Sequence, residues 1–286
     1  MTLTDWLIEY EPIIRMSFFV GMLCIMGIWE IKKPKRALLI PKYLRWSNNL
    51  GLVVLNSFLL RLVFPTAAVG AAVLANQHGW GVFNYYSLPV LSSIILSIIF
   101  MDLIIYLQHV LTHAVPLLWR LHRVHHADLD YDVTTGSRFH PIEIMISMGI
   151  KCSIILLLGP PIVAVMLFEI ILNAMAMFNH GNVGLPNTLD RVLRWFIVTP
   201  DMHRIHHSIE DDEANSNFGF NLSCWDRLFG TYKKHPRLEG QDMVIGIRQF
   251  RTPKQSSWIT GLLIMPFVGK VDGYAINQRK WSDPNI

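Results

Sequence analysis

Long apolar runs separated by polar segments dominate the first two thirds of the chain. A helix needs about 20 mostly apolar residues to cross a hydrocarbon layer about 30 Å thick. Three runs approach or exceed this length, at residues 14–31, 48–75 and 87–108. The second run contains Pro65, which we expect to bend or end its helix because proline cannot donate a backbone hydrogen bond. These runs predict membrane-spanning helices.

Two shorter apolar runs, at residues 144–158 and 161–178, flank the sequence Gly159-Pro160-Pro161. A glycine followed by two prolines stops a helix, so this pattern predicts a helical hairpin that turns within or near the membrane. The run at residues 257–268 is too short to span, and we expect it to lie in the interface. The predicted fold is an all-α, polytopic membrane helical bundle of about four spans that includes this hairpin.

Composition supports a membrane protein. The 286 residues are 52% hydrophobic and only 16% charged, with a mean hydropathy of +0.35. A typical soluble domain is about 45–50% apolar and about 25% charged. This composition therefore argues against a disordered chain and against an ordinary soluble enzyme. A net charge of +4 without a basic stripe gives no indication of nucleic-acid binding, and three well-separated cysteines form neither a disulfide framework nor a CxxC metal site.

Basic residues predict the orientation of the bundle. The segment that follows the first run is rich in Lys and Arg, whereas residues 76–86 contain neither. Because positive charges favour the cytoplasmic side, we expect the first segment and the later polar stretches, 109–142 and 179–256, to face the cytoplasm. These stretches would form a cytoplasmic, histidine-rich cap on an integral, multi-pass protein.

Ten of the twelve histidines lie between residues 109 and 207, and most of them fall into three short motifs. The first is HVLTH, with histidines at i and i+4, which share one face of a helix. The second and third are HRVHH and HRIHH, with histidines at i, i+3 and i+4. Their members are His109 and His113, then His122, His125 and His126, then His203, His206 and His207.

An isolated histidine such as His78 or His235 is more often a cap or a partly exposed polar residue than a ligand. Three clusters near the predicted span ends are different, because crowded imidazolium cations at a membrane would be unfavourable unless a metal kept the rings neutral. Eight or nine imidazoles are enough ligands for two metal ions. No HExxH motif of a zinc protease and no Glu-x-x-His pair of a carboxylate di-iron bundle is present. The remaining interpretation is a histidine-rich di-iron site that activates oxygen.

The three motifs, in this order around a membrane hairpin, resemble those of the fatty acid hydroxylase and sterol desaturase superfamily of membrane oxygenases. The segment Asn217-Phe-Gly and the segment from Asn221 to Tyr232 (NLSCWDRLFGTY) are similar to that family as well. The resemblance covers residues 95–235, which would form the di-iron catalytic domain between N-terminal membrane helices (1–94) and a C-terminal tail (236–286). It implies two iron ions held by the eight histidines of the motifs, and His180 corresponds to the family's additional histidine.

One position departs from the pattern, because Ala176 stands where some members have a further histidine. The metal coordinated from that region would then have one ligand fewer or borrow one. His140, in the segment Arg138-Phe-His-Pro, is the candidate replacement, and capping the helix that begins at Pro141 is the alternative.

Carboxylates near the motifs are candidates for supporting roles. Asp102 lies two helical turns before His109, where a buried carboxylate would need a partner such as a ligand imidazole. Asp201 and the acidic residues between 128 and 132 adjoin the motifs and could orient imidazoles or equally lie in solvated loops.

The predicted function is O2-dependent hydroxylation or desaturation of a lipid, such as a sterol or a fatty acyl chain. The chain shows no dinucleotide-binding fingerprint and no haem-binding domain, so electrons would come from a separate ferredoxin or cytochrome b5-like donor. The alternative is a membrane metal transporter or metal-binding protein, for which ligands near the membrane midplane would be expected. A two-zinc membrane hydrolase is a further alternative that lacks a general base at the usual spacing.

Overall fold

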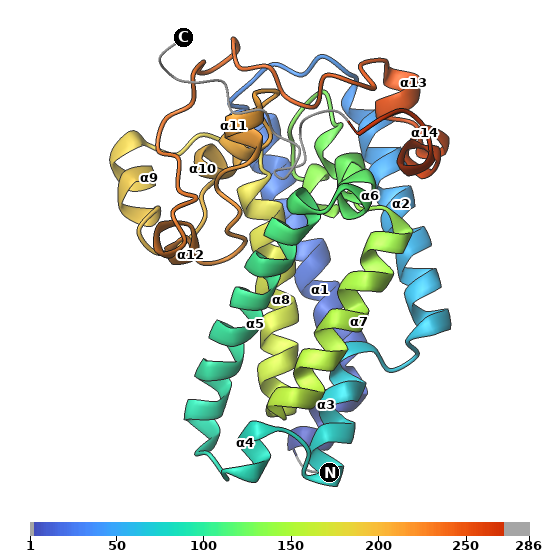
Figure 1. The fold of residues 1–286 in the computed structure, drawn as a ribbon, viewed down its shortest axis with the longest axis vertical. Coiled ribbons are helices and arrows are strands. Elements are labelled where there is room, and N and C mark those ends of the chain that lie inside the picture. The colour runs from blue at the N-terminus through green and yellow to red at the C-terminus, as the bar shows by residue number, and fades with distance from the viewer. Residues whose placement is uncertain (1–2, 272–286) are drawn as a thin grey trace.

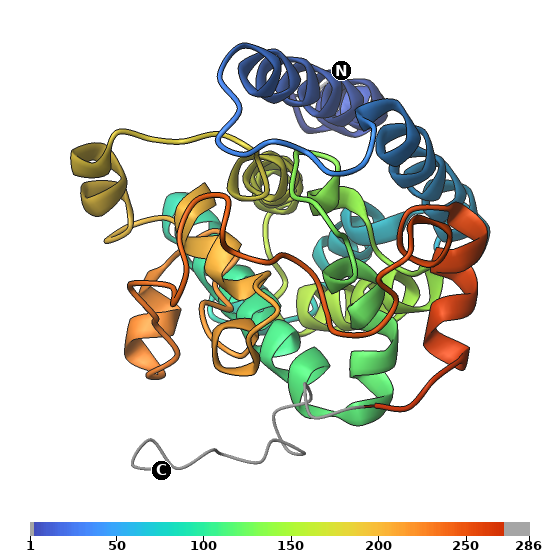
Figure 2. The ribbon, with the colours of Figure 1, turned by 90° about the horizontal axis from the view of Figure 1, so that it is seen from above.

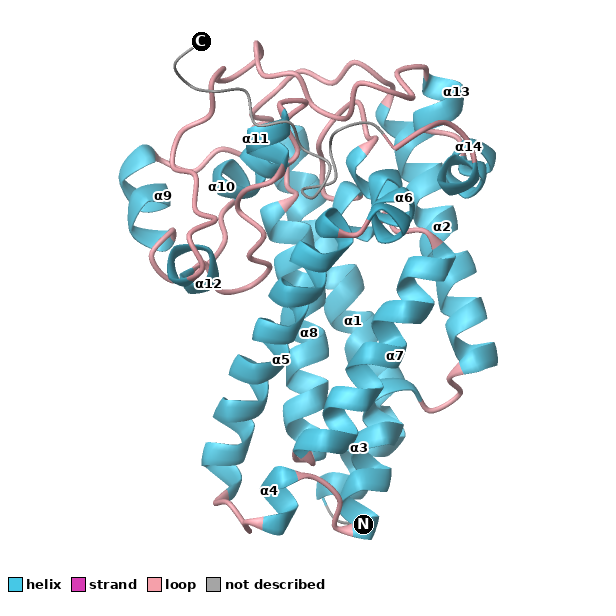
Figure 3. Ribbon diagram, viewed as in Figure 1, coloured by secondary structure: helices cyan, strands magenta, loops and turns pink. Residues whose placement is uncertain are grey.

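The computed structural model describes residues 3–271, and every regular element in that range is a helix (Figure 3). Outside the helices, the described residues form only three isolated β-bridges. The predicted all-α class is therefore confirmed. Residues 272–286 of the predicted C-terminal tail lie outside the described range.

Five segments are long and apolar enough to cross a membrane, where the sequence predicted about four spans. Both arms of the predicted hairpin qualify separately, with 18 residues each. The segments are α1 (Leu3–Lys32), a segment that contains α2 (Lys42–Val63), α3 (Ala67–His78) and α4 (Val82–Tyr85), and then α5 (Val90–Ala114), α7 (Pro141–Leu158) and α8 (Ile162–Asn179).

The helix boundaries follow the turn residues that the sequence indicated. Helix α2 ends two residues before Pro65, and α3 begins two residues after it. Helix α7 ends at Gly159, whose φ of 64° lies in the left-handed region that glycine adopts without strain. Pro161 then precedes the first residue of α8. The predicted hairpin is therefore present.

The long helices expose apolar side chains on their outer surface. Ile13, Met16, Ile25 and Ile28 of α1 and Leu62 of α2 are each more than half exposed. In water such a surface would favour aggregation, whereas in a bilayer it contacts acyl chains. This inverted pattern, together with the five long helices, confirms a polytopic helical membrane protein.

The remaining helices gather at one end of the bundle, opposite the N-terminus (Figure 1). We call this end the cap. It contains α6 (Pro116–His126), η1 (Thr135–Ser137), α9 (Asn187–Leu193), α10 (Pro200–His206), α11 (Asp211–Ala214), α12 (Cys224–Leu228), α13 (Pro253–Ser256), α14 (Ile259–Ile264) and η2 (Met265–Phe267).

Helix α8 links the bundle to the cap. It packs against α1, α3 and α5 along its length and against α10 and η1 at its end. Viewed from the cap, α8 lies inside a ring formed by the other long helices (Figure 2). The short run at 257–268 forms α14 and η2, which pack against α2 and α6 through the buried Leu262 and Met265. Its location in the membrane interface stays a prediction.

Candidate metal centre

All nine histidines predicted as ligands lie together, buried in the cap end of the bundle. They form two groups, and the ligand nitrogens within each group lie within 4.8 Å of one another. The first group contains His109, His113, His122, His126 and His206, and the second contains His125, His180, His203 and His207. Helices α5, α6 and α10 and the end of α8 contribute these residues.

The spacing of the motifs explains the division into two groups. In each of the two HxxHH motifs, the residues at i and i+4 belong to one group and the residue at i+3 belongs to the other. The two motifs differ in which group receives the pair at i and i+4. His122 and His126 enter the first group, while His203 and His207 enter the second. The groups also touch, because the His126 and His207 rings stack with centroids 4.5 Å apart.

The hydrogen bonds of the first group favour a bound cation. His109 Nδ1 donates to the Phe218 carbonyl at 2.8 Å, and His206 Nδ1 donates to the Ser216 carbonyl at 2.7 Å. A neutral imidazole with its proton on Nδ1 has a lone pair on Nε2. The two Nε2 atoms are nevertheless only 3.0 Å apart. Two facing lone pairs repel each other unless an ion lies between them, and nitrogens about 2.1 Å from one ion at right angles are about 3.0 Å apart.

The second group has the same character. His180 Nδ1 donates to the Ala176 carbonyl at 2.8 Å, which leaves the Nε2 lone pair free. This Nε2 lies 3.1 Å from Nε2 of His125, 3.1 Å from Nε2 of His203 and 3.2 Å from Nε2 of His207. One lone pair cannot satisfy three such neighbours by hydrogen bonding. Both groups therefore fit a metal ion, and imidazole nitrogen suits iron, zinc, copper and nickel.

Burial keeps the rings in the neutral form that a metal requires. Loss of solvent lowers the pKa of His180 to about 3 and that of His206 to about 3. Burial, followed by the charges of neighbouring imidazoles, lowers the pKa of His125, His203 and His207 well below the usual range. The cluster is therefore poorly suited to hold protons at neutral pH and well suited to coordinate cations.

Glu143 is a supporting residue that the sequence reasoning missed. Its carboxylate lies 2.6 Å from Nδ1 of His122, and it stands in the first turn of α7. A carboxylate behind an imidazole fixes the tautomer and the direction of the ligand nitrogen. The available signal was its position three residues after His140, in the motif His-Pro-Ile-Glu. Its partner lies 21 residues away, which no local pattern reveals.

The secondary candidates lie outside both groups. His140 caps α7, since its Nδ1 accepts from the backbone of Ile142 at 3.2 Å, which was the alternative interpretation. The hydrogen bonds of Asp102 go to the segment after the third motif, including Trp225 Nε1 at 2.8 Å, and none goes to an imidazole. Asp201 pairs with Arg204 and Lys35. At position 176 the backbone carbonyl, not a side chain, contacts His180.

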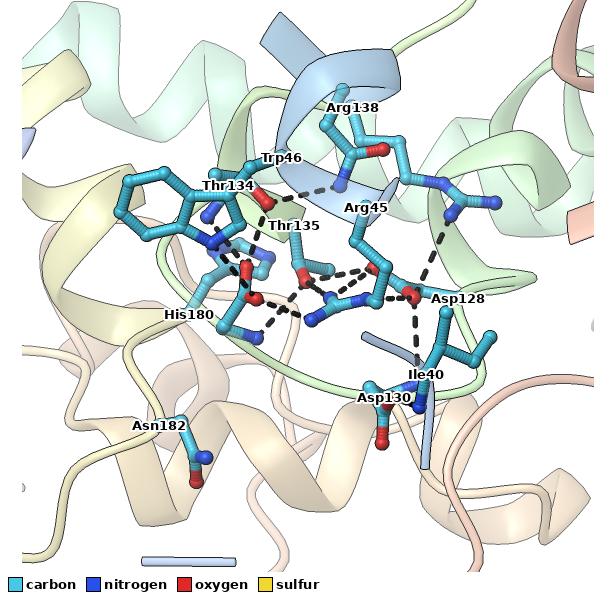
Figure 4. A network of polar contacts seen from close by, with 12 residues as sticks. Ile40, Arg45, Trp46, Asp128, Asp130, Thr134, Thr135, Arg138, His180 and Asn182 are labelled. Carbon is cyan, nitrogen blue, oxygen red and sulfur yellow. Dashed lines mark hydrogen bonds and ion pairs between the residues drawn. The ribbon is translucent and has the colours of Figure 1, made fainter. Parts of the chain in front are cut away.

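A buried ion network supports the loop that follows the second motif (Figure 4). Arg45 of α2 bonds Asp128 at 2.7 Å and also pairs with Asp132, and all three side chains are buried. Burial alone would raise the pKa of Asp128, but the charges of Arg45 and Arg138 lower it. These aspartates are therefore buried ion-pair partners, not solvated loop residues.

Gly136 lies where this loop meets the second histidine group. A Cβ atom at this position would lie 2.3 Å from the Ala176 carbonyl oxygen and 3.1 Å from His180 Nδ1. Only glycine leaves room for the hydrogen bond that orients His180. The loop thus reaches the candidate metal centre directly.

The fold and the site define an integral membrane protein whose helices position two adjoining histidine clusters at one end of the bundle. A model of the fatty acid hydroxylase family matches residues 94–231, and this part of the chain belongs to that family. The superfamily predicted from the three motifs is therefore confirmed.

Curated relatives agree with this membership. The chain is 31% identical to an ornithine lipid hydroxylase of Rhizobium tropici over 64% of this chain and 52% of the relative. It is 29% identical to an alkylglycerol monooxygenase of Xenopus tropicalis, over 64% and 41% of the two chains. It is 27% identical to human lathosterol oxidase, over 62% and 57%. The aligned part thus spans about half the length of these relatives. No solved structure matches the chain significantly.

Proposed function

We propose that the chain is a membrane-bound, non-haem di-iron oxygenase that hydroxylates or desaturates a lipid. The observation that carries this proposal is the pair of buried histidine groups, of five and four imidazoles, whose facing nitrogens need a cation between them. The relatives are a lipid hydroxylase, an ether-lipid monooxygenase and a sterol oxidase by name, which supports a lipid substrate.

Two bound iron ions would supply the O2 reduction and C–H oxidation that amino-acid side chains cannot perform. For hydroxylation, the balance is one lipid C–H bond, one O2, two electrons and two protons, which give one C–OH and one water. The electrons would come from a ferredoxin or cytochrome b5-like protein. In desaturation, two adjacent C–H bonds, one O2, two electrons and two protons give one C=C bond and two waters.

The contributions of the chain itself are position, charge and exclusion of water. Carbonyls of residues 176, 216 and 218 and the Glu143 carboxylate hold four of the imidazoles in fixed directions. The nine imidazoles would form a neutral, nitrogen-rich ligand set that leaves the positive charge of two bound iron ions uncompensated. Burial of all nine rings keeps bulk water away from the reacting centre.

We also propose that the cap faces the cytoplasm. The basic residues between 32 and 45 extend from the last residue of α1 to the first turn of α2 at the cap end, and the connection at the opposite end, residues 79–89, has no Lys or Arg. Accessibility of a cysteine placed at exposed Lys254 to a membrane-impermeant thiol reagent tests this. Labelling of inverted vesicles but not of intact cells is expected, and the reverse would place the cap outside.

The di-iron proposal is tested by metal content and turnover. We expect the chain, purified without oxygen in detergent, to hold about two irons per polypeptide with no haem absorption band. His206→Ala and His125→Ala each remove a ligand from one group and should lower the iron content and abolish lipid oxidation. His78→Ala is the control, because His78 is exposed at the opposite end of the bundle.

Other outcomes of the metal and turnover measurements would favour the alternative functions. Retained turnover in His206→Ala would contradict the assignment of ligands. Zinc alone, with no activity after iron is supplied, would favour the metal transporter or the hydrolase. The location of all nine histidines at one end of the bundle, instead of along a path through it, speaks against transport.

A further inference from the structure

A cavity of about 970 Å³ opens in the cap beside α9, on the outer side of α10. This volume lies at the upper end of the range of about 300–1,000 Å³ that is typical of small-molecule sites. Helix α10 separates the cavity from the metal centre. Its residues Asp201 and Arg204 line the cavity, whereas His203 and His206 belong to the histidine groups.

The cavity walls carry an excess of positive charge. Seven of the lining side chains are Lys or Arg, and three are Asp or Glu. Asp190 pairs with Arg194 at 2.6 Å, and Asp201 pairs with Arg204 and, at 3.4 Å, with Lys35. Two of the three acids are therefore already neutralised by neighbours, and several cations remain for a ligand.

Two of the remaining cations, Arg36 and Arg227, form no close ion pair with a carboxylate among the described residues. Arg36 donates to the backbone carbonyls of Gly240 and Met243. Arg227 donates to the carbonyl of Arg194 and is stacked 4.4 Å from the Trp195 ring. Burial and the nearby charge of Arg204 lower the pKa of Arg36, and the charges of Asp130 and Asp242 offset this only in part. An anion in the cavity would relieve this repulsion.

An apolar surface borders the cavity on its membrane side. Val192, Trp195 and Phe196 at the end of α9 and Leu228 and Phe229 of the α12 turn are each half or more exposed. Figure 1 shows α9 and α12 projecting from the bundle beside the upper part of α5.

One ring contact places this surface beside the cap end of an apolar span. The Phe229 ring stacks on Tyr106, within the apolar span α5, at a centroid distance of 5.4 Å. Tyr106 precedes the cap end of α5 by about two helical turns. Exposed Trp and Phe at such a level are typical of the zone between headgroups and acyl chains.

We propose that this cavity binds the phosphate headgroup of an anionic membrane lipid, with its acyl chains against the apolar surface of α9 and α12. Arginine and lysine supply the charge, and the exposed aromatic residues supply the contact with the hydrocarbon. A concave pocket of this size fits a headgroup better than a partner protein, whose docking commonly covers about 800 Å² of a flatter surface. The proposal does not depend on the oxygenase activity.

The test is binding of short-chain lipids to the purified full chain in a neutral detergent, measured by calorimetry. The probes are dihexanoyl phosphatidylglycerol, dihexanoyl phosphatidylcholine and inorganic phosphate. The variant Arg191→Glu/Lys234→Glu reverses two exposed lining charges, and Lys254→Glu reverses an exposed charge on α13, away from the cavity. Helical content by circular dichroism checks that both variants fold.

We expect phosphatidylglycerol to bind the wild type and Lys254→Glu at least about tenfold more tightly than phosphatidylcholine, and the double variant to lose at least about tenfold in affinity. The affinity of the wild type for phosphatidylglycerol should also fall with added salt, because salt screens charges. This measurement tests the electrostatic contribution to binding even if the double variant misfolds.

Other outcomes overturn the proposal. Equal affinity for both lipids, or no loss in the double variant, would exclude a built anionic site. Binding of inorganic phosphate as tight as that of phosphatidylglycerol would indicate a soluble anion. Binding of an acidic ferredoxin that the double variant loses, without lipid binding, would identify the cavity as an electron-donor surface. Metal content and turnover play no part in these measurements, so failure here is distinguishable from failure of the oxygenase proposal.

Discussion

Asn217 holds the backbone that orients two histidines of the first group, and its replacement should release both. Its φ of 52° lies in the left-handed region, and its side chain is fully buried. The carbonyls on either side, of Ser216 and Phe218, accept the Nδ1 protons of His206 and His109. Asn217 is thus a positioning residue that acts through backbone carbonyls.

The magnitude follows from three hydrogen bonds and one dihedral angle. The Asn217 amide donates to the carbonyls of Met202 and Lys233, and its oxygen accepts from the Lys233 backbone at 2.8 Å. At about 1 kcal/mol for each bond, Asn217→Gly should destabilise the protein by about 3 kcal/mol. Asn217→Ala should lose about 1 kcal/mol more, because alanine pays for the left-handed conformation that glycine and asparagine tolerate.

The assay combines thermal unfolding in detergent with metal affinity by chelator competition. Both variants should bind metal at least about tenfold more weakly than the wild type, since the imidazoles lose their fixed direction. Asn173→Ala is the control, because Asn173 is on α8 and donates its hydrogen bond to the backbone carbonyl of Glu169, within the same helix. Wild-type metal affinity in Asn217→Ala would refute the role of these carbonyls, and equal stability of the two variants would refute the strain.

Three further changes test other parts of the site. Glu143→Gln keeps the shape but removes the charge behind His122, so metal affinity should fall about 10- to 100-fold by chelator competition. Burial lowers the pKa of His180 and His206 to about 3, far below about 6.5 in the unfolded chain, so the unfolded chain takes up protons first as pH falls. Stability of the metal-free protein should therefore be lost below about pH 6.5, by about 1.4 kcal/mol per histidine at about pH 5.5, and a flat melting profile between pH 8 and 5 would contradict this. Arg45→Met removes the closest cation from the buried carboxylates of Asp128 and Asp132 and leaves Asp128 only Arg138, at 3.6 Å. It should destabilise the protein by about 3–5 kcal/mol in thermal unfolding, whereas a loss below about 1 kcal/mol would mean that the network is not buried as a unit.

Local patterns in the sequence were sufficient to locate the long apolar helices and the nine histidines that the structure brings together. Hydropathy over about 20 residues locates a span without knowledge of its neighbours, and Gly159 with two prolines locates the hairpin turn. The histidine motifs were equally local, because i and i+4 share a helix face whatever the helix packs against. The count of spans differed because each arm of the hairpin was judged too short on its own.

The supporting residues could not be predicted, because their partners are distant in the chain. Asp128 is buried by Arg45, which lies 83 residues earlier in another helix. Asp102 holds the segment near Trp225, 123 residues later, and not the histidine two turns away. A carboxylate beside a motif looks the same in the sequence whether it is solvated or paired. Only the packing of helices decides between these environments.

The two HxxHH motifs explain why the histidines form two groups. Successive residues on a helix are rotated by about 100°, so i and i+4 diverge by about 40°, whereas the adjacent pair at i+3 and i+4 diverges by about 100°. An HxxxH motif such as His109 and His113 can therefore contribute to only one group. The added histidine at i+3 points to the neighbouring group, which is where His125 and His206 lie. Because α6 and α10 each contribute to both groups, neither group is complete unless both helices are in place. Loss of either helix from the cap would then remove histidines from both groups at once.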